Sequence, residues 1–314
     1  MKNIKCIIMY HEKDVNKNRW FIDTFIEKSR KYNIDMRLVT VEEYEKKIAD
    51  FEDVHAVIAR MINPKVSDEL EKRGIRVFNS AYISKICNNK AECIRHVNSF
   101  GVKSIPTIAV NKSKNNSMSF ELCGENNSEL NAIMKYISRE NRLPASDEFI
   151  IKSVCGHGGQ EVLTLSEYVS EYGDELIVND EFGSQEQNAS DYYTDYCVIQ
   201  TVVKNEGDVR VYIVGGDIIG AVKRTSDTLK SNYSLGGHVE IYKLNESQII
   251  QVKNITDNIS LDYAGIDFLL VDNEFIFNEI EDVVGARMLS LCSDTDYIEL
   301  YLKHINNACI THIL

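Results

Sequence analysis

Three acidic residues near the C-terminal end of the chain could together hold a divalent cation. Asp267, Glu279 and Glu281 interrupt two consecutive apolar segments that predict a β-hairpin. A three-residue loop centred on Asn273 would place Asp267 directly across from Glu279, with Cβ atoms about 5 Å apart. A two-residue loop would send these two side chains to opposite faces. Asn273 can adopt the left-handed conformation that three-residue loops favour, so we expect the register that collects the acids on one face.

The close spacing of these carboxylates decides what they could do. Acids held that close repel each other unless a proton or a cation lies between them. Hard oxygen ligands of this kind suit Mg²⁺ shared with the phosphates of a substrate. The competing interpretation is a solvent-facing acidic strand, whose charge discourages aggregation. We favour the metal site, because three acids on one strand face are otherwise unfavourable.

A lysine followed by a glycine-rich loop could bind phosphate groups. Lys152 ends an apolar strand four residues before Gly156, and the loop also contains Gly158 and Gly159. Glycines let backbone N–H groups approach an anion closely, and the lysine adds a positive charge. An ordinary hairpin loop with a surface lysine is the alternative. The spacing is not that of the Walker P-loop, which is therefore excluded.

A second predicted hairpin turns at the Gly-Gly pair 215–216. With a two-residue turn, Asp208 would face Lys223 and Arg210 would face Ala221. Strand alternation then places the apolar side chains, Val222 among them, on the other face. The polar face would carry Asp208, Arg210, Tyr212 and Lys223. The alternative is a solvated outer face with a weak cross-strand ion pair.

Two further features could contact a substrate. Residues 226–237 form a twelve-residue polar loop, a length typical of lids and binding segments. Lys230, Ser231 and Asn232 in this loop could reach a phosphate, although a plain flexible loop explains the composition equally well. Arg287 lies six residues after Glu281, and its planar guanidinium could bind a substrate carboxylate. A surface arginine at the start of a helix is the alternative.

The composition limits the classes of partner. The chain has 314 residues, with 35 Lys and Arg against 48 Asp and Glu, and a net charge of −13. This acidic balance argues against nucleic-acid binding, which depends on neutralising phosphates. No apolar run reaches the roughly 20 residues of a membrane span, and the N-terminus does not resemble a signal peptide. The eight cysteines form no C-x-x-C pair, so we expect reduced thiols in a cytoplasmic protein without a membrane partner.

The elements that would position these residues follow from periodicity and from turn residues. The first 85 or so residues predict a small α/β layer with a parallel sheet, and the absence of G-x-G-x-x-G excludes a Rossmann cofactor site. In this part we expect strands at 4–10, 35–39, 54–59 and 75–78, and helices at 19–31 and 66–72. Beyond it we expect helices at 90–100, 127–139 and 246–258, strands at 107–110 and 148–152, and a turn-like stretch at 111–119.

The order of these motifs resembles that of a known superfamily. Lys90 begins a helix, Lys152 precedes the glycine loop, and Asp208-Val209-Arg210 opens the Gly-Gly hairpin. The series continues with Lys223-Arg224, Lys230-Ser231-Asn232, Asp267 and Asn278-Glu279-Ile280-Glu281. From about residue 84 to 291 the chain is similar to the ATP-grasp superfamily, and specifically to RimK-like carboxylate–amine ligases. The resemblance implies an ATP-grasp fold preceded by an α/β pre-ATP-grasp domain, with units at 1–84, 85–195 and 196–314.

The same resemblance implies a role for each motif. ATP would be the cofactor, together with one or two Mg²⁺ ions held by Asp267, Glu279 and Glu281. Nucleotide contacts would come from Lys90, Lys152, Gly156, Gly158, Gly159, Gln200, Thr201, Val202, Asp208, Lys223, Lys230, Ser231 and Asn232. Within that set, the backbone of 200–202 would be the hinge that binds adenine, and Asp208 would lie near the ribose or the nucleotide edge.

Such enzymes convert a carboxylate to an acyl phosphate, which an amine then attacks, with release of ADP and phosphate. Phosphoryl transfer needs positioning and neutralisation of charge more than acid–base catalysis. We therefore expect Arg210, with Arg224 second, to stabilise the transferred phosphoryl group and the oxyanion. The partners would be small-molecule or peptide carboxylates and amines, and a homo-oligomer is compatible with the sequence.

Three positions depart from the family pattern. Glu281 replaces the usual asparagine of the second metal, Lys230 replaces an arginine, and Thr201 replaces an acid in the hinge. The main alternative function is a non-catalytic nucleotide-binding or scaffold module with the same fold, and a kinase-like phosphotransferase is the third. The presence of Arg210 and of all three candidate metal ligands favours the ligase.

Overall fold

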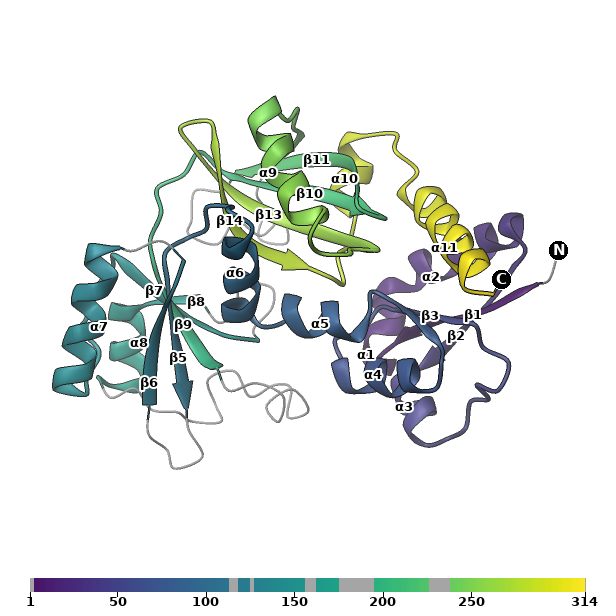
Figure 1. Cartoon of the computed structure of the whole chain (residues 1–314), viewed down its shortest axis with the longest axis horizontal. Coiled ribbons are helices and arrows are strands. Elements are labelled where there is room, and N and C mark those ends of the chain that lie inside the picture. The colour runs from purple at the N-terminus through teal and green to yellow at the C-terminus, as the bar shows by residue number, and fades with distance from the viewer. Residues whose placement is uncertain are drawn as a thin grey trace.

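The described residues of the protein, seen here as a computed structural model, form three β-sheets (Figure 1). One sheet is parallel and the other two are antiparallel. This combination of a parallel α/β layer with antiparallel sheets confirms the predicted fold class. None of the helices in the described part of the chain is both long and apolar enough for a membrane span. The structure describes residues 3–112, 118–124, 127–155, 162–174, 195–225 and 238–313.

The first unit is a four-stranded parallel sheet in the order β2-β1-β3-β4. Its strands are β1 (Ile4–Tyr10), β2 (Ile34–Thr40), β3 (Ala56–Ala59) and β4 (Arg76–Phe78). All four were expected from the sequence, with ends that differ by at most two residues. The helical segments between them are α1 (Glu12–Val15), η1 (Asn16–Asn18), α2 (Arg19–Ser29), η2 (Arg30–Tyr32), α3 (Val41–Glu45) and α4 (Pro64–Lys72). Helix α2 covers one face of the sheet, and α3 and α4 cover the other.

Local capping explains where these helices begin and end. Helix α4 starts at Pro64, two residues before the predicted start, because the Asn63 side chain accepts a hydrogen bond from the Val66 N–H at 3.1 Å. The predicted helix 19–31 ends early at Ser29 and continues as the 3-10 turn η2, which closes at Asn33 with a positive φ of 54°.

The second unit is an antiparallel sheet in the order β6-β5-β9-β7-β8. Its strands are β5 (Thr107–Lys112), β6 (Met118–Cys123), β7 (Phe149–Ser153), β8 (Val162–Thr164) and β9 (Asp195–Thr201). Helices α7 (Ser128–Glu140) and α8 (Leu165–Tyr172) pack on it. The turn-like stretch expected at 111–119 is wrong at both ends, because the β5–β6 pairing continues to Lys112 and resumes at Met118. Strand β9 lies between β5 and β7, so this sheet extends to Thr201 rather than ending at residue 195.

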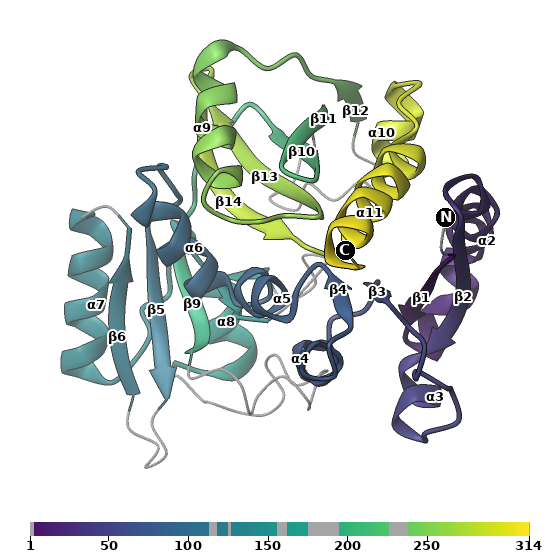
Figure 2. The ribbon, with the colours of Figure 1, turned by 45° about the vertical axis from the view of Figure 1, so that its right-hand side comes forward.

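The third unit is an antiparallel sheet in the order β12-β11-β10-β13-β14. Its strands are β10 (Asp208–Val214), β11 (Asp217–Thr225), β12 (His238–Ile241), β13 (Tyr263–Val271) and β14 (Glu274–Glu281). Helices α5 (Ala81–Cys87), α6 (Lys90–Ser99) and α9 (Glu246–Thr256) share one core with this sheet. Helices α10 (Arg287–Cys292) and α11 (Tyr297–Ile313) lie on its other side (Figure 2).

The three units are joined by shared packing and hydrogen bonds. Before it enters β5, the chain at 103–105 pairs with β14: Ile105 N–H donates to Phe277 O at 3.0 Å, and Phe277 N–H donates to Lys103 O at 2.9 Å. The C-terminal helix α11 lies between the first and third sheets, and its buried side chains contribute to a core with members from both. The site described below is therefore supported by all three units.

Removing a buried side chain from α11 tests this shared core. Leu302 is 0% exposed within that core. We expect Leu302→Ala to lower the free energy of unfolding by about 2–5 kcal/mol, because the cavity it leaves cannot be refilled. Urea denaturation monitored by circular dichroism measures the change. The control Ile310→Ala lies on the same helix at 41% exposure and should change stability by less than about 1 kcal/mol. Equal losses for the two variants would contradict the shared core.

Candidate functional site

The β10–β11 hairpin carries two of the candidate catalytic residues, in a register that differs from the prediction. Gly215 and Gly216 have positive φ angles of 58° and 83°, as a two-residue turn requires. The predicted pairs persist only up to Ile213 opposite Ile218, because Ile219 is an extra residue that forms a β-bulge. Beyond the bulge the register is shifted by one.

This shift changes which side chains share a face. Asp208 pairs with Arg224 rather than with Lys223, and Arg210 pairs with Val222 rather than with Ala221. Lys223 lies opposite Val209, on the other face from Arg210, so the predicted polar face was wrong about Lys223 and about Val222. Arg224 takes the place expected for Lys223.

The β13–β14 hairpin has the predicted pairing for a different reason. Its loop has two residues rather than three, because Asp272 and Asn273 both have positive φ and Val271 pairs with Glu274. That loop alone would separate the acids. Asn278 forms a bulge, however, which shifts the register back and places Asp267 directly opposite Glu279. Glu281 pairs with Gly265, two residues along, so the three acids share one face as predicted.

Two arginines and three carboxylates form a buried network where β10, β11, β13 and β14 meet. Arg210 Nε and Nη2 donate to the two oxygens of Asp267, each at 2.7 Å, and Arg224 Nη2 donates to Asp267 Oδ2 at 2.8 Å. Arg224 also pairs with Asp208, and Arg210 pairs with Glu281. Asp267 is 2% exposed, and the two arginines are 9% exposed or less. The central carboxylate thus holds both guanidinium groups in fixed positions.

Burial and charge act against each other on these acids. Burial alone would raise the pKa of Asp267, but Arg210 and Arg224 hold that pKa well below its usual range. Burial raises the pKa of Glu281, and the single contact with Arg210 does not overcome it. Asp267 is therefore a firmly ionised anchor, whereas Glu281 is a carboxylate that lacks sufficient positive charge nearby.

The acids fit a divalent cation only in part. Glu281 Oε2 is buried and, apart from the ion pair with Arg210, makes no hydrogen bond among the described residues. Glu279 faces the same side. Asp267, in contrast, already accepts hydrogen bonds on both oxygens, although a carboxylate has about four lone-pair sites. In the part of the chain that the structure describes, no three His, Cys, Asp or Glu side chains are grouped closely enough to hold a metal ion. Their role as metal ligands stays a prediction.

Two lysines lie where the second unit meets this network. The N–H of Lys90, the first residue of α6, donates to Val154 O just beyond β7 at 3.1 Å, which fixes the start of the helix beside the end of the strand. Burial lowers the pKa of Lys152 to about 8, with Glu279 raising it and Lys90 lowering it further. The structure therefore brings Lys152 into the electrostatic range of both Glu279 and Lys90.

Other predicted nucleotide contacts are engaged within the protein. Gln200 is buried near the end of β9, where Nε2 donates to Thr107 Oγ1 at 2.9 Å. The N–H of Val202 donates to Glu148 O at 2.8 Å, and Thr201 pairs with Phe149. These contacts occupy Gln200 Nε2 and the Val202 N–H, whereas Gln200 Oε1 is buried without a hydrogen-bond partner among the described residues.

The remaining predicted site residues are a buried aspartate, an exposed arginine and six residues outside the described ranges. Asp208 is 4% exposed and forms an ion pair with Arg224, so it helps to fix the position of that guanidinium in the network. Arg287 is exposed at the start of α10 and makes no ion pair with the acids among the described residues. The residues outside the described ranges are Gly156, Gly158, Gly159, Lys230, Ser231 and Asn232.

A buried asparagine missed by the sequence analysis closes the open end of the acid-bearing hairpin. Asn79 Nδ2 donates to Tyr263 O at 2.7 Å and to Asp282 O at 2.9 Å. Its Oδ1 accepts from the N–H groups of Asp262 and Tyr263, at 2.7 and 3.2 Å. Asn88 Nδ2 donates to Asp282 Oδ1 at 2.9 Å. An asparagine directly after an apolar strand is typical of a turn, so no sequence signal pointed to these contacts across roughly 200 residues.

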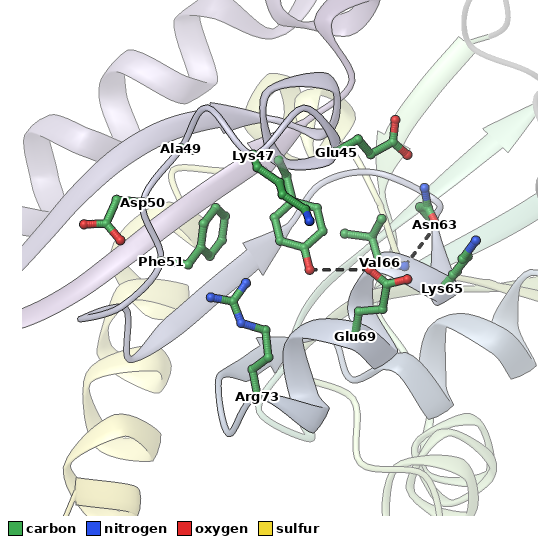
Figure 3. A pocket seen from close by; sticks show the side chains of 11 residues that line it. Glu45, Lys47, Ala49, Asp50, Phe51, Asn63, Lys65, Val66, Glu69 and Arg73 are labelled. Atoms are coloured by element: carbon green, nitrogen blue, oxygen red, sulfur yellow. Dashed lines mark hydrogen bonds between the residues drawn. The ribbon is translucent and has the colours of Figure 1, made fainter.

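A pocket of about 490 Å³ lies elsewhere, on the first unit between the α3 region and α4 (Figure 3). Tyr44 packs edge-on against Phe51 with ring centroids 5.0 Å apart, and the Arg73 guanidinium lies 5.5 Å from the centre of the Phe51 ring. None of the predicted site residues lines it.

Comparisons with known proteins agree with this architecture. Residues 134–305 match the RimK-like ATP-grasp domain family. The chain is 26% identical to Uncharacterized protein MG011 of Mycoplasma genitalium, over 97% of this chain and 93% of that protein. It is 26% identical to human N-acetylaspartylglutamate synthase A, over 77% of this chain and 56% of that protein. The solved structure of D-alanine–D-alanine ligase from Bacillus anthracis in complex with ATP superposes with a TM-score of 0.63 at 13% identity, over 98% and 97% of the two chains. This last likeness shows the fold alone.

Replacing Asn79 tests whether it secures the hairpin. Asn79→Ala leaves buried N–H and C=O groups of three residues without partners, so we expect a loss of roughly 2–4 kcal/mol in the free energy of unfolding. Chemical denaturation measures it. Asn258→Ala is the control, because Asn258 is exposed and its side chain bonds only Asn254 O among the described residues, and its effect should stay below about 1 kcal/mol. An unchanged free energy of unfolding in Asn79→Ala would show that Asn79 does not secure the hairpin.

Proposed function

The chain belongs to the RimK-like ATP-grasp family, and we propose that it is an ATP- and Mg²⁺-dependent ligase that joins a carboxylate to an amine. The γ-phosphoryl group of ATP passes to a carboxylate oxygen, and ADP leaves. The nitrogen of an amine then attacks the acyl carbon, the C–O bond to phosphate breaks, and phosphate departs with the bonding electrons. The amine loses a proton, and an amide or peptide-like bond remains.

The observation that carries the proposal is the fixed position of Arg210. Its guanidinium is buried and held by Asp267 through two hydrogen bonds, beside Glu279 and Glu281. A preorganised cation in a site shielded from water stabilises developing negative charge without reorganising during the reaction. Arg224 donates to Asp267 Oδ2 as well and fixes the same geometry. This arrangement suits the charge of a transferring phosphoryl group and of the tetrahedral oxyanion that follows.

The surrounding residues supply the remaining requirements of phosphoryl transfer. We propose that Lys90 and Lys152 hold the nucleotide phosphates, since the two lysines lie within electrostatic range of each other and Lys152 also of Glu279. Glu279, Glu281 and the remaining lone pairs of Asp267 would hold Mg²⁺. When bound, Mg²⁺ neutralises phosphate charge and orients the transferred group. An anionic ligand would also raise the lowered pKa of Lys152, because it stabilises the protonated form.

The names of the similar proteins guide the choice of substrates. N-acetylaspartylglutamate synthase A and D-alanine–D-alanine ligase both carry names that describe joining of amino acids or their derivatives. We propose amino acids or short peptides as the acid and the amine. The cytoplasmic location and a homo-oligomer stay predictions.

A nucleotide-binding module without turnover is the second candidate. The observation that favours it is the occupation of Asp267 by two arginines, together with Glu281 at a position where the family usually has asparagine. Incubation with MgATP, pooled amino acids and hydroxylamine separates the candidates, because hydroxylamine traps an acyl phosphate as a hydroxamate. Hydroxamate and ADP in equal amounts support the ligase. Nucleotide binding without any product across the pool would support the module.

A change at Lys152 tests the phosphate-binding role. We expect Lys152→Met to raise the KM for ATP at least about tenfold, because a half-buried charge beside the phosphates is lost while its apolar stem is kept. Steady-state ADP release measures KM. Lys135→Met, on the exposed face of α7, is the control and should behave like the unaltered protein. An unchanged KM in Lys152→Met would remove this lysine from the site.

Glu279→Gln tests the metal-binding face with almost no change in volume. We expect turnover to fall at least about a hundredfold and the apparent Mg²⁺ requirement to rise, because the amide has no negative charge to hold the ion. Initial rates over a Mg²⁺ titration provide both numbers. Glu274→Gln, at the exposed turn of the same hairpin, serves as the control. Normal rates in Glu279→Gln would contradict its assignment as a ligand.

A further inference from the structure

Arg60 is a buried cation to which none of the described carboxylates is paired. It directly follows β3 and is 9% exposed. Its Nη2 donates to Val284 O at 2.8 Å, and Nε lies 3.5 Å from the Tyr10 hydroxyl. The guanidinium also lies 5.3 Å from the centre of the Phe21 ring and 5.5 Å from that of Tyr263. Among the residues that the structure describes, no acid forms an ion pair with it.

These contacts leave donors of Arg60 unused. A guanidinium carries five N–H donors, and Nη1 meets no acceptor within the described ranges. Burial disfavours the charged form, but the phenols of Tyr10 and Tyr263 raise the pKa of Arg60 above its ordinary value, so the charge persists. Aromatic rings compensate a buried cation only partly, and a hydrogen-bonded anion would do so far better.

A second buried polar group beside Arg60 also lacks a partner. Tyr263 is 1% exposed, and its hydroxyl makes no hydrogen bond among the described residues. Its ring lies against the guanidinium of Arg60. A buried hydroxyl without a partner lowers the stability of the fold unless a ligand supplies the missing hydrogen bond. An anion that accepts from Arg60 Nη1 and from this hydroxyl would satisfy both groups.

The position in the sheet points to a ligand as well. In the order β2-β1-β3-β4, the chain leaves β1 toward one side of the sheet and leaves β3 toward the other. Ligands of open parallel sheets bind outside the carboxyl ends of the strands at such a point. Tyr10 is the last residue of β1, and Arg60 is the first residue after β3. Both therefore lie at this position.

The same position adjoins the proposed catalytic network. Val284, which Arg60 holds through its carbonyl, lies three residues beyond Glu281. Its Cγ2 and the Cδ of Arg210 both lie close to the point that a Cβ on Gly265 would occupy, at 2.8 and 3.1 Å. Arg60 thus lies one side chain away from Arg210, on the side of the first unit.

We propose that Arg60, together with the Tyr263 hydroxyl, binds a substrate carboxylate that is not itself phosphorylated. The inference rests on the proposed ligase activity and specifies it further: one of the two substrates must carry a second, non-reacting carboxylate. That group belongs either to a dicarboxylic acid substrate or to an amino-acid amine. The planar guanidinium suits a carboxylate better than an ammonium group could.

Kinetics of three variants test the proposal with substrates found in a pool of amino acids, succinate and glutarate. We expect Arg60→Met to raise the KM of one substrate at least about tenfold while the KM for ATP stays unchanged. Arg60→Lys should recover part of that loss, because it keeps the charge but not the fork. Tyr263→Phe should raise the same KM roughly threefold without lowering the melting temperature, since its hydroxyl bonds no residue in the part of the chain that the structure describes.

A matched arginine separates binding from stability. Arg76 pairs with Asp262 at 2.7 Å at the same junction of the first and third units. Arg76→Met should lower the melting temperature but leave every KM unchanged. If Arg60→Met behaves in this way too, Arg60 only joins the units and the proposal is wrong.

Amide analogues identify the source of the carboxylate. Where the amine supplies it, the α-amide of that amino acid should bind as weakly to the unaltered protein as the free amino acid binds to Arg60→Met. Where the acid supplies it, the monoamide of the diacid should do so. Normal binding of both amides would overturn the proposal. Absence of ADP release with every pool would instead refute the proposed ligase, whereas turnover with an unchanged KM in Arg60→Met would refute only the inference.

Discussion

The double pairing of Asp267 with Arg210 and Arg224 is the interaction on which the candidate site depends. It joins strands from two hairpins and places two guanidinium groups where they cannot move independently. Such a buried ionic network contributes little net stability, because desolvating its charges offsets most of the attraction. A chain that keeps one at the centre of a sheet gains a fixed arrangement of charge, which is what the transfer of a highly charged phosphoryl group requires.

The rest of the fold keeps this network in place from three directions. Strands β10 and β13 carry the anchor pair, and the β14 edge is bound to the segment 103–105 that leads into the second sheet. Asn79, directly after β4, forms hydrogen bonds to Tyr263 in β13 and to Asp282 directly after β14, at the open end of the β13–β14 hairpin. Helix α11 fills the space between the first and third sheets. A change far from the acids, in the first unit, can therefore alter their geometry.

Local patterns predicted the elements well, and long-range contacts much less. The four strands of the first sheet and the start of α6 at Lys90 followed from periodicity and capping. The pairing of Asp267 with Glu279 was correct although the loop was not, because the bulge at Asn278 compensated for the shorter turn. The bulge at Ile219 has no marker in the sequence. It places Lys223 on the face opposite to Arg210, whereas the prediction put both on one face. Asn79 and Arg60 act across about 200 residues or more, where periodicity carries no information.

The central claim is that this network transfers phosphate to a carboxylate, and the path of an oxygen atom tests it most directly. The acid substrate is labelled with ¹⁸O in its carboxylate and incubated with unlabelled ATP, Mg²⁺ and the amine. The account predicts inorganic phosphate that carries one ¹⁸O atom, because the carboxylate oxygen that received the phosphoryl group leaves with it. Phosphate without the label, formed at the same rate, would contradict the claim and show that water rather than the carboxylate receives the phosphoryl group.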